Sequence, residues 1–155
     1  MSFVVSALPA EPFTPLFALS DEDLAARGAM RRTVDSKPGF PCRVTLEDAE
    51  PGETVLLLNY EHQPADTPFR ASHAIYVREG RPSAKLAKDE VPTLFRHRVM
   101  SLRAFSGEGM MLAAEVAPGA DLEPAVERLL AEPGVAYLHA HYAGMGCYAA
   151  RIDRA

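Results

Sequence analysis

The feature that most constrains this fold is an apolar run, TVLLLNY at residues 54–60, which follows a proline-glycine turn signal. In an extended strand, Val55 and Leu57 point to one face, and the leucines next to them point to the other. Apolar side chains on both faces predict a strand that is covered on both sides. The sequence therefore predicts a buried central strand.

A second strand is predicted over residues 72–78, where His73 shares one face with two apolar residues. We expect the two segments to pair as an antiparallel hairpin with Tyr60 opposite Ser72. This register places Asn59 across the ladder from His73, close enough for side-chain contact. The connection between the strands is longer than the two to about five residues usual in hairpins, and long loops often carry function.

The remaining chain alternates short apolar segments with turn signals. Further strands are predicted near residues 3–7, 31–34, 101–105, 110–116, 137–142 and 147–152. Helices are predicted near residues 20–28, 91–98 and 121–132, the last with Asp121 as its N-cap. Because hairpins join most of the strands, we predict the α+β class, a mainly antiparallel sheet of hairpins with two or three helices packed on it.

No repeat or composition shift divides the 155 residues. We therefore predict a single domain over residues 1–155, with an N-terminal arm and helix (1–39) and a core (40–155). The net charge of −5 and the lack of a basic block argue against a nucleic-acid partner. No segment is apolar for the roughly 18–20 residues that a membrane span needs, and no signal peptide is recognisable. We expect a cytoplasmic protein with reduced thiols, and exposed sheet edges make a homodimer a candidate assembly.

The loop end of the central hairpin is the first candidate site, and it would bind a small anionic ligand. Arginine suits the recognition of planar carboxylate or phosphate groups. The predicted ligand-binding residues are Arg43, Asn59, Tyr60, Arg70 and His73. The plainer interpretation is that Arg70 bonds its own loop and that His73 is a core histidine. A third interpretation is a structural or protein-interaction domain that has no small-molecule site.

Cys42 is the candidate nucleophile of a rival, enzymatic hypothesis. It lies beside Arg43, and a neighbouring cation lowers the pKa of a thiol. His73 or His62 would act as its base, with Asn59 orienting the imidazole. No known cysteine-enzyme signature surrounds Cys42, and free cysteines are most often small buried apolar groups.

His139 and His141 are weak candidates for metal ligands because they lie two residues apart on a predicted strand and face the same side. Cys42, His62, His73 or Cys147 could complete a tetrahedral zinc site. In the simplest hairpin register, however, Cys147 points away from His141. No metal-binding motif fixes a third ligand, so the sequence predicts no metal and no cofactor.

Several segments carry a family resemblance: FPCRVTLEDAEPGE, VLLLNYEHQP, TPFRASHAIYVRE, LRAF and HAHYAGMGCYAARI. They run from about Phe40 almost to the last residue, and in them the chain resembles the bacterial family catalogued as domain of unknown function family 1203. The resemblance implies a small soluble bacterial protein of one domain. It implies no activity, cofactor or substrate.

Overall fold

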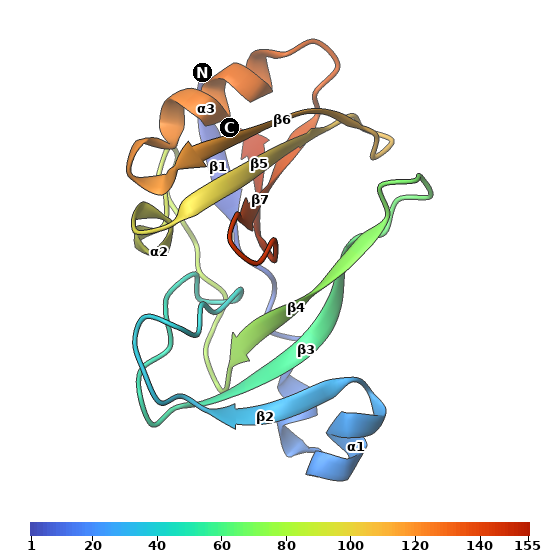
Figure 1. Cartoon of the computed structure of the whole chain (residues 1–155), viewed down its shortest axis with the longest axis vertical. Helices are drawn as coiled ribbons and strands as arrows, with labels where there is room; N and C mark the ends of the chain where they lie inside the picture. The colour runs from blue at the N-terminus through green and yellow to red at the C-terminus, as the bar shows by residue number, and fades with distance from the viewer.

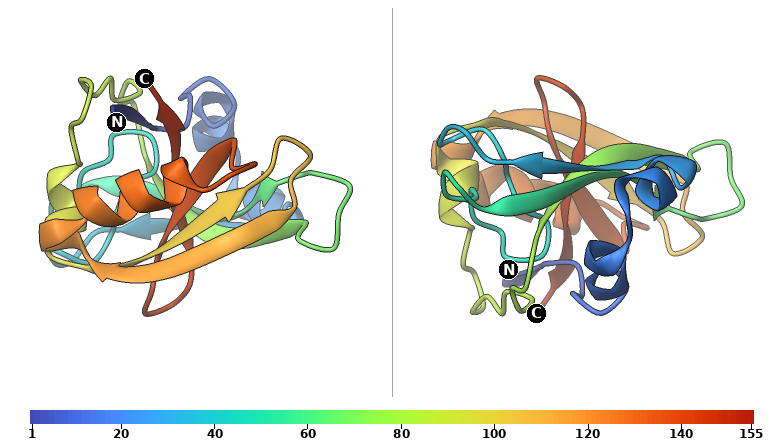
Figure 2. Two further views of the ribbon diagram at one scale, coloured as in Figure 1. Left: turned by 90° about the horizontal axis from the view of Figure 1, so that it is seen from above. Right: turned by 90° about the horizontal axis from the view of Figure 1, so that it is seen from below.

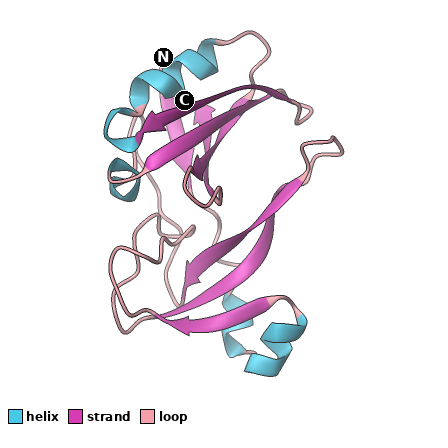
Figure 3. Ribbon diagram, viewed as in Figure 1, coloured by secondary structure: helices cyan, strands magenta, loops and turns pink.

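The computed structural model describes all residues 1–155, in which strands dominate (Figure 3). The strands are β1 (Phe3–Ser6), β2 (Ala29–Thr33), β3 (Thr54–Gln63), β4 (Ala71–Arg78), β5 (Val99–Phe105), β6 (Met111–Pro118), β7 (Tyr137–Tyr142) and β8 (Tyr148–Arg154). The helices are α1 (Asp21–Ala26), α2 (Thr93–Arg96) and α3 (Glu123–Ala131), with 3-10 turns η1 (Thr14–Ala18) and η2 (Gly119–Asp121). None of the helices is both long and apolar enough to cross a membrane.

The strands form two separate sheets, and every strand pair is antiparallel. The larger sheet has the order β1-β8-β7-β5-β6, and the smaller has the order β2-β3-β4. Figure 1 shows the larger sheet above the smaller, and Figure 2 shows the two overlapping when seen along that direction. The α+β class is therefore confirmed, with the predicted hairpins divided between two sheets.

The central hairpin β3–β4 exists, but the predicted register is wrong by one residue. Tyr60 pairs with His73 instead of Ser72, and Asn59 pairs with Ala74. The reason is that β3 continues to Gln63, so the connection shortens to residues 64–70 and the turn sets a different alignment. The predicted burial holds at the start of the strand, where Val55 and its neighbour Leu56 are fully buried.

Side-chain alternation gives the larger sheet two different faces. One face packs under α3, whose buried residues include Val126, Leu129 and Leu130. The other carries His139, His141 and residues of β8 toward the smaller sheet. Aliphatic residues dominate the first face, whereas the second places rings and polar groups between the sheets.

Helix α3 does not begin as predicted. Leu122 is its N-cap, and no side chain caps the helix, because Asp121 belongs to the preceding turn η2. Glu123 in the first turn instead accepts hydrogen bonds from Arg96 of α2, at 2.9 Å and 2.5 Å. The negative charge of an acidic residue in the first turn also interacts favourably with the positive end of the helix dipole. The ion pair therefore ties α2 to the start of α3.

Gly119→Ala is expected to destabilise the protein because η2 and α2 touch through their backbones. A Cβ atom at Gly119 would lie 1.6 Å from the carbonyl oxygen of Phe95 and 2.7 Å from that of Arg98. Overpacking of this kind typically costs about 1–3 kcal/mol of unfolding free energy. Urea denaturation would measure the loss. Gly107→Ala is the matched control, because a Cβ atom added there would meet nothing within 4 Å, and an equal loss in both variants would contradict the prediction.

Candidate metal centre

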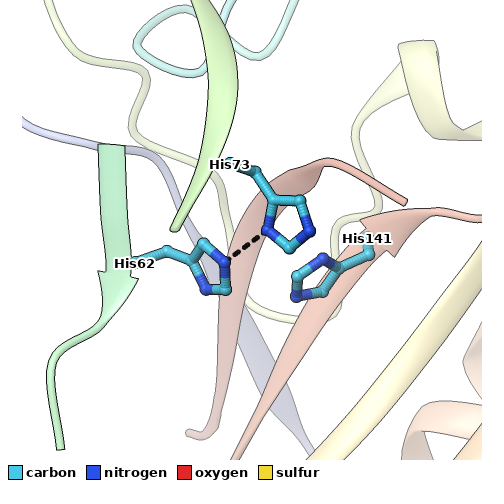
Figure 4. Close-up of side chains that lie close together, drawn as sticks. All are labelled: His62, His73 and His141. Atoms are coloured by element: carbon cyan, nitrogen blue, oxygen red, sulfur yellow. Dashed lines mark hydrogen bonds between the residues drawn. The ribbon is translucent and has the colours of Figure 1, made fainter. Parts of the chain in front are cut away.

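Three histidines from three strands converge in the space between the two sheets (Figure 4). His62 lies near the end of β3, His73 near the start of β4 and His141 near the end of β7. One ring nitrogen from each residue lies within 4.8 Å of the other two. This convergence of imidazole nitrogens is the most concentrated set of metal-ligand atoms in the fold.

A β-bulge brings His62 into this cluster. The pairing of β3 with β4 shifts between Glu61 and Gln63, so His62 is the extra residue. Bulges commonly redirect a side chain beside a functional site. Here His62 Nε2 lies 2.6 Å from His73 Nδ1, as the dashed line in Figure 4 shows. Because both atoms are ring nitrogens, one must donate a proton and the other must accept it.

The orientation of His141 is fixed by the turn that follows β7. Its Nδ1–H donates to the carbonyl oxygen of Gly146 at 2.9 Å, which leaves Nε2 with a lone pair. That Nε2 atom is buried and has no hydrogen-bond partner. Gly146 has a φ of +81°, a conformation that suits glycine. A ligating histidine typically donates its second N–H to such a carbonyl.

Aromatic rings enclose the cluster on its inner side. Tyr148 stacks on His62 with ring centroids 4.9 Å apart and an angle of 6° between the planes. His139 lies farther from the cluster, with its centroid 5.8 Å from that of His62 and 6.4 Å from that of His141. His139 therefore borders the three histidines without joining them. Its Nδ1 atom and the Nδ1 atom of His62 are also buried without a partner.

The buried histidines are neutral at pH 7. Burial lowers the pKa of His62 to about 4, that of His139 to about 3 and that of His141 to about 2. Burial also lowers the pKa of the half-buried His73. The charge of Arg103, on β5, adds to each of these shifts. Neutral imidazole is the form that binds a metal ion.

Of the residues predicted to bind an anionic ligand, His73 lies in the cluster and Tyr60 lies beside it. The ring of Tyr60 is half-buried, with its centroid 6.3 Å from that of Tyr148. Asn59 points away, because alternation along β3 leaves it exposed. The structure therefore brings two of these three hairpin residues toward the space between the sheets.

The two predicted arginines lie elsewhere. Arg70 is exposed and pairs with Glu61 across the base of the loop, with Nε 3.0 Å from a carboxylate oxygen. Arg43 is buried and donates to the carbonyl oxygens of Tyr148 and Pro41. Arg43 lines a separate cavity, away from the three histidines.

Cys42, the candidate nucleophile, is fully buried in the hydrophobic core of the smaller sheet. Its Sγ accepts hydrogen bonds from the backbone N–H groups of Thr45 and Arg78, at 3.4 Å and 3.3 Å. No histidine is hydrogen-bonded to it. Cys147 is a second free thiol and is half-buried. Neither cysteine joins the three histidines.

The sequence predicted His139 and His141 as the weak metal-ligand pair and gave His62 and His73 only as two of four residues that could complete the site, so it did not single out the three histidines that converge. The pair His139 and His141 suggested a ligand set because the two share a face, yet only His141 belongs to the cluster. The bulge at His62 and the packing of the two sheets decide which histidines lie close together. The only sign of the cluster in the sequence was that each of these histidines lies near one end of a strand.

Comparison with known proteins identifies a family. A family model described as "Protein of unknown function (DUF1203)" matches residues 39–154, which include all three histidines. No curated protein and no solved structure matches the chain. Since the matched region covers most of the 155 residues, the chain belongs to the DUF1203 family.

Proposed function

We propose that this protein binds a divalent transition-metal ion, zinc first among them, through His62, His73 and His141. The observation that carries the proposal is the convergence of three neutral imidazoles, with ligand atoms within 4.8 Å of one another. Imidazole suits zinc, copper, iron and nickel, and geometry with availability selects among them. Three histidines also match the number of protein ligands in one class of zinc site.

The hydrogen bonds support metal binding at specific atoms. His141 Nε2 is free because Nδ1 is engaged by Gly146, and His62 Nε2 faces His73 Nδ1. For a cation to bind between these two nitrogens, the proton that they share would move to the other ring nitrogen of the imidazole that carries it, and both rings would stay neutral. Tetrahedral zinc with Zn–N bonds of about 2.0–2.1 Å separates its ligands by about 3.3 Å. The 2.6 Å contact would therefore open slightly, which the half-buried His73 has room to allow.

Three protein ligands leave one coordination position open. Open positions distinguish catalytic zinc sites from structural ones, which are closed by four protein ligands. His73 is the most exposed of the three histidines, so a fourth ligand would reach the open position from its side. The positive charge of Arg103 reaches all three histidines and favours an anionic fourth ligand, such as hydroxide or a carboxylate.

Metal titration tests the proposal directly. Chelator-treated protein titrated with Zn²⁺ or Co²⁺ at pH 7 is expected to bind about one ion per chain, and binding should weaken as the pH falls because protons compete for the imidazole nitrogens. Bound Co²⁺ should give the visible absorption of a tetrahedral ion. His141→Gln should weaken binding by about 100-fold or more, because it removes a ligand rather than an outer-shell partner.

Two other histidine substitutions provide controls. His97 is exposed and lies outside the cluster, so His97→Gln should leave affinity unchanged. His139→Gln alters a bordering ring and should weaken binding far less than His141→Gln. Metal binding that is absent, or that survives His141→Gln and His73→Gln while the fold persists, would refute the proposed centre.

A further inference from the structure

A cavity separate from the histidine cluster is lined by residues of β4 and of the turn that joins β7 to β8. Its volume is about 550 Å³. Its walls are mostly apolar and include Leu57, Tyr76, Val99, Tyr142 and Met145. Val99 and Met145 are exposed at 53% and 90%, so the cavity opens to solvent beside apolar side chains. The body of a small apolar molecule fits such a lining.

Arg43 supplies the charge of this cavity. Its side chain is only 3% exposed, and it forms no ion pair with a carboxylate. Its Nε donates to the carbonyl oxygen of Tyr148 at 2.8 Å and Nη1 donates to that of Pro41, while Nη2 makes no hydrogen bond within the chain. A buried guanidinium without a counter-ion is costly, and an anion would compensate it.

The second arginine at the cavity differs from Arg43 in its partners. Arg98 donates to both carboxylate oxygens of Asp48, at 2.6 Å and 3.1 Å, so its charge is already neutralised. Both guanidinium groups lie against the ring of Tyr142, at 5.1 Å and 5.3 Å from its centroid. The hydroxyl of Tyr142 is buried without a partner. The unbalanced positive charge at this cavity therefore comes from Arg43.

We infer that this cavity binds a small monocarboxylate with an apolar body, whose carboxylate pairs with Arg43. The apolar walls hold the body of the ligand, and the guanidinium presents the planar donor geometry that a carboxylate accepts. This proposal does not depend on metal binding, although the turn between β7 and β8 borders both the cavity and the histidine cluster. Gly146 of that turn holds His141, and Cys147 lines the cavity.

Titration with hexanoate tests the inference. The readout is the NMR signal of the Met145 methyl group, which lies at the mouth of the cavity. Hexanoate is expected to bind with a dissociation constant on the order of 1 mM or below. Hexanamide has the same apolar body without the charge, and acetate has the charge without the body. Each should bind at least about tenfold more weakly than hexanoate.

Amino-acid substitutions test whether hexanoate binds in this cavity and through Arg43. Arg43→Gln should weaken hexanoate binding at least about tenfold. Arg43 also donates to two backbone carbonyls, so its replacement could disturb the fold. Ala74→Trp is therefore a second variant: Ala74 lines the cavity from an exposed position, and tryptophan there should fill the cavity and weaken hexanoate binding. Arg70→Gln, at an exposed arginine away from the cavity, should change nothing.

The two proposals fail independently of each other. His141→Gln should weaken metal binding about 100-fold or more but retain hexanoate binding, because His141 does not line the cavity. Equal binding of hexanoate and hexanamide, or unchanged binding in Ala74→Trp, would overturn the inference.

Discussion

Arg78→Met is expected to lower the unfolding free energy by about 3–5 kcal/mol, the range observed when one partner of a buried ion pair is removed. Arg78 is only 5% exposed, and its guanidinium donates to both carboxylate oxygens of Glu53, at 2.8 Å and 2.6 Å. It also donates to Glu47 at 3.0 Å. Methionine would keep much of the side-chain volume but leave Glu53, which is 19% exposed, with only the longer 3.6 Å contact to Arg81 and the N–H of Glu50.

Arg128→Met is the matched control for this measurement. Arg128 also pairs with a glutamate, Glu115, but its side chain is 61% exposed. An exposed pair of this kind typically contributes less than about 1 kcal/mol. Urea denaturation of both variants at pH 7 would give the comparison. Similar losses in the two variants would mean that burial does not govern the strength of the Arg78 ion pair.

The pairing of β3 with β4 could be predicted from the sequence because apolar residues on both faces of a segment permit few other structures. The register could not be predicted. It depends on the bulge at His62 and on how far the strands extend toward the loop, and neither leaves a pattern in the residues. Since side chains alternate along a strand, one shifted residue changes every cross-strand neighbour. Asn59 therefore lies opposite Ala74 and not opposite His73.

The histidine cluster could be predicted only in part. Alternation along one strand correctly placed His139 and His141 on the same face. The packing of the two sheets could not be predicted. His62 and His73 belong to the smaller sheet and come close to His141 only when the sheets pack together. Arg78 shows the same limit. In the sequence it is only the last residue of a predicted strand, yet its burial with Glu53 follows from contacts that no local pattern reveals.

Lowering the pH from 7 to 5 is expected to destabilise the metal-free protein by roughly 3–5 kcal/mol. The pKa of His62 is lowered to about 4, that of His139 to about 3 and that of His141 to about 2, from 6.5 in the unfolded chain. The unfolded state therefore binds protons more readily than the folded state below pH 6.5. Stability is fully present above that pH and declines as the pH falls, by about 1–2 kcal/mol for each histidine.

Burial sets the direction of these shifts, and other charged groups near the cluster modify their size. Arg103 of β5 and Arg151 of β8 oppose protonation of the histidines, while Glu61 and Asp153 favour it. Glu53 would add its own acid sensitivity only at lower pH. Its pKa is lowered from 4.5 to about 2 by Arg78, so its contribution is lost as the pH falls below 4.5. Glu53 therefore contributes little to the change in stability between pH 7 and pH 5.

Urea denaturation of metal-free protein at half-unit steps of pH would measure this dependence. His141→Gln should reduce the loss between pH 7 and pH 5, because glutamine does not titrate, whereas His97→Gln at an exposed position should not. A loss of stability that is the same in His141→Gln and in the unsubstituted protein would show that other groups cause it. A stability that does not change between pH 7 and pH 5 would mean that His62, His139 and His141 are not held neutral between the sheets, and two of these, His62 and His141, are proposed metal ligands. Without neutral imidazoles, the proposed metal centre would lose its physical basis.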